Sequence, residues 1–182
     1  LADKDELHIK KALDAGAAGI IAPMVNNAAQ AEKVVNWAKY PPLGTRGVGL
    51  GRAHGYGLQF AEYVEKANQL VVVVTQIEHI QAVEKIAEIV QVEGIDALIV
   101  GPYDLSASMG LIGQVDHPDV IAAIDQGTQV CRAAGMPLGI FGVSAEAVQP
   151  YVTSGYSLLI VGADGMLIGK AAEELFAQVR KF

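Results

Sequence analysis

The sequence has a single cysteine, Cys131, and it has no long apolar run and no basic run. One cysteine excludes an internal disulfide and favours a reducing compartment. No apolar stretch approaches the roughly 20 residues of a transmembrane helix, and no signal-peptide pattern opens the chain. The net charge of −7 argues against a nucleic-acid partner. We therefore expect a cytoplasmic protein that binds neither membranes nor nucleic acids.

The composition and the pattern of apolar segments are typical of one globular α/β domain over residues 1–182. Hydrophobic residues make up 52% of the chain and charged residues 18%. Short apolar stretches alternate with helical patterns, and this alternation predicts a parallel sheet. Either a doubly wound sheet or part of a barrel would satisfy it. The predicted strands are residues 19–23, 71–75, 97–100, 137–141 and 157–161. The predicted segments after the second strand include one helix over 80–90 and a loop over 101–117.

Two acidic residues follow neighbouring strands of this sheet. Glu78 comes after the apolar run at 71–75, and Asp104 comes after the run at 97–100. The carboxyl ends of neighbouring parallel strands lie side by side, so we expect the two carboxylates to converge. They would repel each other unless one takes up a proton or a cation lies between them. We predict the cation, a divalent ion such as Mg²⁺ or Mn²⁺. The alternative role for each residue is capping of the helix that follows it.

A long irregular segment covers residues 41–57. Its glycine-rich stretch at 47–51 follows a diproline and sits within a loop, whereas the glycines of a dinucleotide-binding motif follow a strand and open a helix. We therefore do not predict nucleotide binding. His54 is expected to be an exposed loop histidine.

Several motifs in order along the chain resemble one family. They are LDAGA (13–17), APMV (22–25), YPPLGTRGVG (40–49), QIE (76–78), VEGID (92–96), GPYDLS (101–106), HP (117–118) and VGAD (161–164). Together they resemble the HpcH/HpaI aldolases, which are metal-dependent class II pyruvate aldolases. The resemblance spans nearly the whole chain.

The resemblance implies roles for particular residues. Glu78 and Asp104 would be the ligands of Mg²⁺, Mn²⁺ or Co²⁺, and Gln76 would face the keto-acid end of the substrate. Backbone amides around Tyr103 and Asp104 would hold the pyruvate carboxylate, although the family usually has a small residue in place of Tyr103. Asp14, near the end of a predicted helix, would pair with the catalytic histidine of an adjacent subunit. Arg46 would help to bind an anionic substrate or would simply hold its loop in place.

The chemistry implied is aldol cleavage or formation of 4-hydroxy-2-oxo acids. The ion would chelate pyruvate as a Lewis acid, so that its enolate attacks an aldehyde and no Schiff-base lysine is needed. The fold implied is a TIM (β/α) barrel. Family members carry three further strands, a general-base histidine and a pyruvate-binding arginine before the residue that matches Leu1. We therefore expect a barrel lacking its first three strands, from a homo-oligomer that is hexameric in the family. Either the sequence is a fragment of a longer enzyme or the chain is inactive alone.

Two alternatives stay open. The chain would be a non-catalytic α/β module if its acids bind a regulatory ion or nothing. It would be a citrate-lyase-like carbon–carbon lyase if it acts on acyl-CoA thioesters, but the sequence shows no signal for an adenine-nucleotide pocket.

Overall fold

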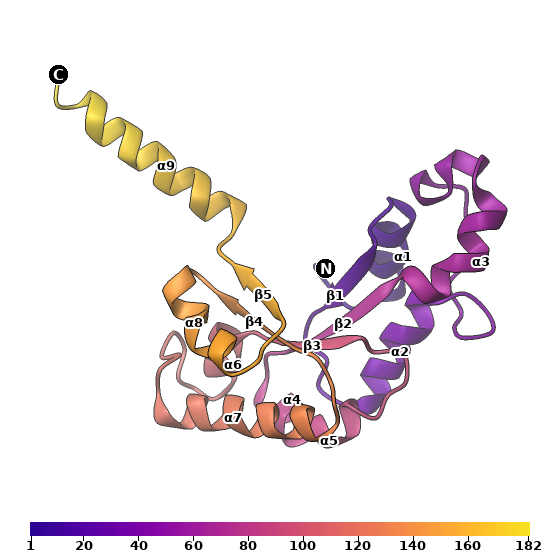
Figure 1. Cartoon of the computed structure of the whole chain (residues 1–182), viewed down its shortest axis with the longest axis horizontal. Coiled ribbons are helices and arrows are strands. Elements are labelled where there is room, and N and C mark those ends of the chain that lie inside the picture. Colours follow the sequence, from indigo (N-terminus) through magenta and orange to yellow (C-terminus); the bar gives the residue numbers. More distant parts are fainter.

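The computed structural model describes residues 1–182 and has five parallel strands in a single sheet. The strands lie in sequence order, β1-β2-β3-β4-β5, and all five predicted strands are confirmed. The sheet curls into a half-barrel (Figure 1). The strand bounds are Gly19–Ala22 for β1, Val72–Ile77 for β2, Ala97–Val100 for β3, Leu138–Gly142 for β4 and Leu158–Val161 for β5.

Helices connect all of these parallel strands, as the alternation in the sequence predicts. A short 3₁₀ helix, η1, lies in the long segment after α2. The bounds are Glu6–Asp14 for α1, Ala28–Ala38 for α2, Arg52–Gly57 for η1, Phe60–Leu70 for α3, Ile80–Glu84 for α4, Ile86–Ile89 for α5, Pro102–Ser108 for α6, Pro118–Ala133 for α7, Ala145–Thr153 for α8 and Asp164–Val179 for α9.

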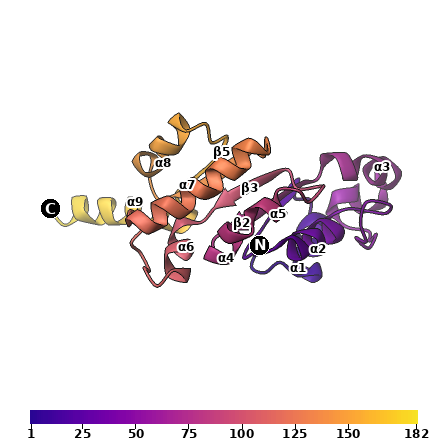
Figure 2. The same ribbon diagram turned by 90° about the horizontal axis from the view of Figure 1, so that it is seen from below.

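The two faces of the sheet differ in what covers them. Helices α2, α4, α5 and α7 lie against one face (Figure 2), where 30 buried apolar residues form the main core. The concave face has only a small buried cluster of Val74, Ala97 and Ile99. Side chains alternate between the faces of a strand, so Gln76 shares the concave face with Val74. Polar residues therefore reach the concave face only at the carboxyl edge.

Two local predictions were wrong. The helix expected over residues 80–90 is divided at Lys85, whose backbone (φ −107°, ψ 10°) lies outside the helical region, into α4 and α5. Part of the loop expected over residues 101–117 is the helix α6. Pro102 occupies its first turn, where a proline ring fits a helix because no partner for its nitrogen is needed. This helix sets the position of Asp104.

Cys131 lies on α7 and is buried. Burial raises the pKa of its thiol to about 12, as expected of an unreactive cysteine that packs in the interior. None of the helices has both the length and the apolar character needed to cross a bilayer.

Helix α9 stands apart from the sheet (Figure 1) and buries none of its residues. Its exposed apolar side chains are Met166, Leu167, Ile168, Leu175, Phe176 and Val179.

The main core predicts the cost of truncating its side chains. Leu98 of β3 is fully buried in the main core, so Leu98→Ala should lower the free energy of unfolding by about 2–5 kcal/mol. Leu70→Ala is the control, because Leu70 is 63% exposed, and it should change stability by less than about 0.5 kcal/mol. Urea titrations would measure both values. Equal losses would show that Leu98 does not pack as described.

Candidate active site

Glu78 lies one residue beyond the end of β2 and is 5% exposed. Both of its carboxylate oxygens accept hydrogen bonds. The backbone amide of Met24 donates to Oε1 at 2.7 Å, and the side-chain amide of Gln76 donates to Oε2 at 2.6 Å. A carboxylate in this position is costly to bury unless such partners hold it. The structure therefore orients Glu78 from two sides.

Asp104 comes close enough to Glu78 to affect its ionisation. The register pairs Ile77 of β2 with Val100 of β3, so the residues that follow the two strands lie next to each other. Asp104 is in the first turn of α6 and is exposed. Burial raises the pKa of Glu78, and the charge of Asp104 raises it further, while the Met24 amide acts in the opposite direction. This electrostatic effect is compatible with the predicted convergence of the two acids, which stays a prediction.

Gly101, the residue after β3, packs closely against Gln76 and Glu78 at the end of β2. A Cβ atom at this position would lie 2.9 Å from Nε2 of Gln76 and 3.1 Å from Cβ of Glu78. Its φ of −104° is not in the left-handed region that favours glycine, so the need for glycine here comes from space and not from backbone strain. Sequence reasoning quoted Gly101 only within a motif and missed this role, although a glycine between a strand end and a helix is a usable signal of close approach.

The donor set at this edge fits a hard divalent cation. Glu78 and Asp104 follow neighbouring strands there, and the structure groups no three histidine, cysteine, aspartate or glutamate side chains that could hold an ion. Mg²⁺ commonly uses one or two protein carboxylates and completes its shell with water and substrate oxygens. Glu78 is also buried near a like charge and its pKa is raised, and such perturbed groups are concentrated at functional sites.

Tyr103 lies beside Asp104 on α6 and is 57% exposed. Its side chain borders Gly113, where an added Cβ atom would lie 3.5 Å from the phenol oxygen. The carbonyl of Tyr103 accepts a hydrogen bond from the hydroxyl of Ser106 at 2.7 Å, which fixes the first turn of α6. The carboxylate contact expected from the Tyr103 and Asp104 amides stays a prediction.

Asp14 and Arg46 lie at the other end of the sheet. Asp14 ends α1, which leads into the start of β1, whereas Glu78 follows the end of β2. The six residues of β2 separate these edges by roughly 20 Å, at about 3.3 Å a residue. Asp14 therefore does not join Glu78 and Asp104 within this chain. Its predicted pairing with a histidine of an adjacent subunit is compatible with this position and stays a prediction.

Arg46 has different surroundings from those expected of a substrate-binding residue. Its side chain is fully buried, and its guanidinium donates to Asp14 at 2.8 Å and to the hydroxyl of Tyr63 at 3.2 Å. It also stacks over the ring of Tyr40, 4.6 Å from the centroid. The structure thus supports the alternative, in which Arg46 holds its loop in place. Substrate binding by Arg46 stays a prediction that would require the guanidinium to leave Asp14.

His54 is also buried, so the expectation of an exposed loop histidine was wrong. Its Nε2 lies 3.1 Å from the hydroxyl of Tyr40, and its Nδ1 accepts a hydrogen bond from the amide of Gly51 at 3.4 Å. Aromatic rings of Phe60 and Tyr63 pack on the imidazole. Such packing makes His54 part of the interior of the loop segment.

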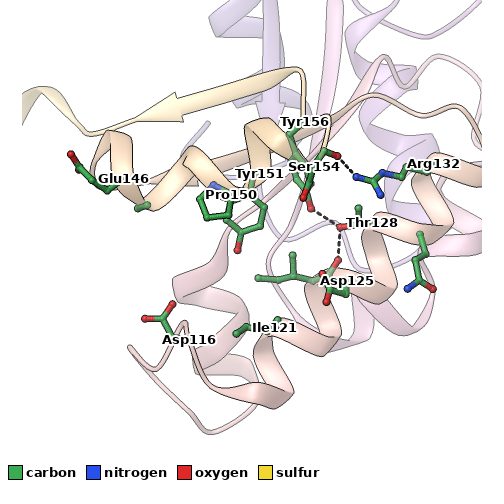
Figure 3. Close-up of a pocket in the computed structure, with 13 residues that line it drawn as sticks. Asp116, Ile121, Asp125, Thr128, Arg132, Glu146, Pro150, Tyr151, Ser154 and Tyr156 are labelled. Carbon is green, nitrogen blue, oxygen red and sulfur yellow. Dashed lines mark hydrogen bonds between the residues drawn. The ribbon is translucent and has the colours of Figure 1, made fainter.

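A separate cavity of about 440 Å³ lies between α7 and α8 (Figure 3). Its wall includes Tyr151, Asp116 and Asp125, and at its base the hydroxyls of Thr128 and Tyr156 lie 2.6 Å apart. The cavity is formed by the outer helices. It contains none of the residues predicted for the site, so it is distinct from the carboxyl edge.

The fold and the paired acids define an α/β protein whose candidate site lies at the carboxyl edge of a parallel sheet. The profile of the HpcH/HpaI aldolase/citrate lyase family matches residues 2–171. The chain belongs to this family. The resemblance seen in the sequence motifs is thereby confirmed.

Curated relatives are aldolases. The chain is 42% identical to 2-dehydro-3,6-dideoxy-6-sulfogluconate aldolase of Pseudomonas putida, over 97% of this chain and 70% of that protein. It is 40% identical to 4-hydroxy-2-oxo-heptane-1,7-dioate aldolase of Shigella flexneri, over 96% of this chain and 66% of that protein. The chain thus spans about two thirds of the length of these relatives.

Solved structures share the fold. A HpcH/HpaI aldolase/citrate lyase family protein from Burkholderia cenocepacia J2315 has a TM-score of 0.90 at 33% identity, over 98% of this chain and 71% of that chain. The citrate synthase SbnG has a TM-score of 0.79 at 28% identity, over 95% of this chain and 67% of that chain.

The space around Gly101 leads to a stability prediction. Gly101→Ala should lower the free energy of unfolding by about 1–3 kcal/mol, because the new methyl group must displace Gln76 or Glu78. Gly169→Ala is the control, since nothing lies within 4 Å of that position in α9, and it should be neutral or stabilising. Thermal unfolding of both variants would measure the difference. A neutral result for Gly101→Ala would contradict the close approach.

The environment of Asp14 predicts a pH dependence. Partial burial would raise the pKa of Asp14, but hydrogen bonds from Arg46 and Lys10 outweigh it and hold the pKa below the ordinary 3.8. The stabilisation from ionised Asp14 is therefore complete above pH 3.8 and is lost as the pH falls through the lower folded value.

Accordingly, Asp14→Asn should lower the free energy of unfolding at neutral pH by roughly 1–3 kcal/mol, because Arg46 and Lys10 lose a charged partner. Urea titrations from neutral pH to below pH 3.8 should show the difference between variant and parent shrinking. Asp116→Asn is the control, because Asp116 is exposed and forms no salt bridge. A difference that stays constant with pH would rule out the charge as its source.

Proposed function

We propose that the protein is a divalent-metal-dependent carbon–carbon lyase that cleaves or forms 4-hydroxy-2-oxo acids from pyruvate and an aldehyde. The observation that carries the proposal is the buried Glu78 beside Asp104 at the carboxyl edge. The aldolase names of the relatives from Pseudomonas putida and Shigella flexneri support the reaction class. Residues 1–182 would form a single domain of this enzyme.

The residues at the carboxyl edge would have different roles in binding the metal ion and the substrate. Glu78 and Asp104 would hold Mg²⁺, Mn²⁺ or Co²⁺, which would supply Lewis acidity toward a 2-oxo acid. Gln76 lies on the concave face with its amide on Glu78, so its carbonyl oxygen is left to contact the keto-acid end of the substrate. The amides of Tyr103 and Asp104 would bind the substrate carboxylate at the start of α6.

The proposal includes a homo-oligomer in which chains complete each other. Asp14 would act beside a histidine of an adjacent subunit, because it cannot reach Glu78 of its own chain. The exposed apolar side of α9 supports packing of this helix on a neighbouring copy, since a soluble chain rarely leaves such a surface uncovered. The family suggests a hexamer.

A second candidate is a citrate-forming or citrate-cleaving enzyme. The likeness to the citrate synthase SbnG, at 28% identity, supports carbon–carbon chemistry on a different acid. Release of pyruvate from a 4-hydroxy-2-oxo acid would favour the aldolase. Release of a product from citrate alone would favour the second candidate.

The paired acids should be essential for turnover. Glu78→Gln and Asp104→Asn should each abolish Mg²⁺- or Mn²⁺-stimulated release of pyruvate from a 4-hydroxy-2-oxo acid in the full-length protein, because each removes a charged ligand. Circular dichroism should show both variants folded. Asp116→Asn, in the cavity between α7 and α8, should keep full activity. Turnover retained in both site variants would end the metal assignment and favour a non-catalytic module.

A further inference from the structure

Met24 has an unusual backbone conformation next to the candidate metal ligand. It lies between β1 and α2, and its φ of +54° is in the left-handed region that side chains with a Cβ atom seldom adopt. Tyr56 is the one other non-glycine residue with a positive φ, also +54°. Such conformations persist only where the surroundings impose them, and they gather at functional sites.

The left-handed turn directs the Met24 amide at Glu78. Its N–H donates to Oε1 at 2.7 Å, across 54 positions of sequence. With Gln76 on Oε2, each carboxylate oxygen has one protein donor. A carboxylate oxygen has two acceptor sites, so one on each oxygen remains for a cation. The amide thus fixes the rotation of the carboxylate without occupying its coordinating positions.

We propose that Met24 is a positioning residue whose strained backbone amide holds Glu78 in the orientation that binds the divalent ion. This inference rests on the metal site of the proposed function. Groups that orient a metal ligand typically affect metal affinity by about 10–100-fold when they are altered. The side chain of Met24 is 39% exposed, and the proposal gives it no role. What matters is the position of its N–H group.

Substitutions at Met24 and Tyr56 separate positioning from general strain. Valine, being β-branched, disfavours a positive φ more than methionine does, so Met24→Val should move the amide and weaken Mn²⁺ binding by about tenfold or more. Glycine adopts this φ freely, so Met24→Gly should keep Mn²⁺ affinity within about twofold. Tyr56→Val imposes the same backbone conflict at a position that is 76% exposed and makes no contact with Glu78, and it should leave Mn²⁺ affinity unchanged.

Mn²⁺ affinity would be measured in the full-length protein by electron paramagnetic resonance of the free ion, with circular dichroism to confirm folding. Folded Met24→Val with unchanged affinity would overturn the proposal. So would an equal loss in Tyr56→Val, because the effect would then be general destabilisation.

A second measurement needs no change at Met24. These 182 residues contain four methionines, Met24, Met109, Met136 and Met166, and each gives one amide signal when the protein is labelled with ¹⁵N-methionine. The backbone amide proton of Met24 is hydrogen-bonded to a carboxylate, so its signal should lie downfield and should move upfield in Glu78→Gln. The amide signals of the other three methionines serve as internal references. A Met24 signal that does not respond to this variant would overturn the proposal even if Met24→Val fails to fold.

The two hypotheses fail in different ways. Unchanged Mn²⁺ affinity in Glu78→Gln would refute the metal site of the proposed function, whatever the Met24 variants do. Lost affinity in Glu78→Gln together with full affinity in folded Met24→Val would keep the metal site and refute the positioning role.

Discussion

Burial of the Glu78 carboxylate is the constraint on which the carboxyl edge of the sheet depends. A negative charge that is almost withdrawn from water needs donors around it, and three segments far apart in sequence supply or accommodate them. The turn after β1 supplies a backbone amide, the end of β2 supplies a side-chain amide, and Gly101 after β3 leaves the space. Each segment is at the end of a strand, so the parallel sheet brings them together.

The repulsion between Glu78 and Asp104 gives this edge its chemical character. Donors stabilise the ionised form of Glu78, yet burial and the neighbouring acid keep its pKa raised. A cation relieves both unfavourable effects at once. A buried acid whose pKa is raised in this way is a feature that is concentrated at functional sites.

Much of this could be predicted from the sequence because it follows from periodicity. Five apolar runs with helical segments between them determine a parallel sheet, and the residue after each run must lie at its carboxyl edge. Features set by tertiary contacts were missed, or were only one of two alternatives, as with the role of Arg46 in holding its loop. Arg46 and His54 are polar residues in a glycine-rich loop, and nothing local shows that aromatic rings of Tyr40 and Tyr63 enclose them. The break at Lys85 and the left-handed turn at Met24 likewise have no local signal.

The packing of Cys131 against the helix-covered face has a practical consequence. A thiol whose pKa is raised to about 12 holds almost no thiolate at neutral pH, and the thiolate is the form that reacts with alkylating reagents. Within these 182 residues it is the sole cysteine. A reporter group could therefore be attached selectively to a cysteine introduced on the surface, on α9 for instance, with the natural residue left in place.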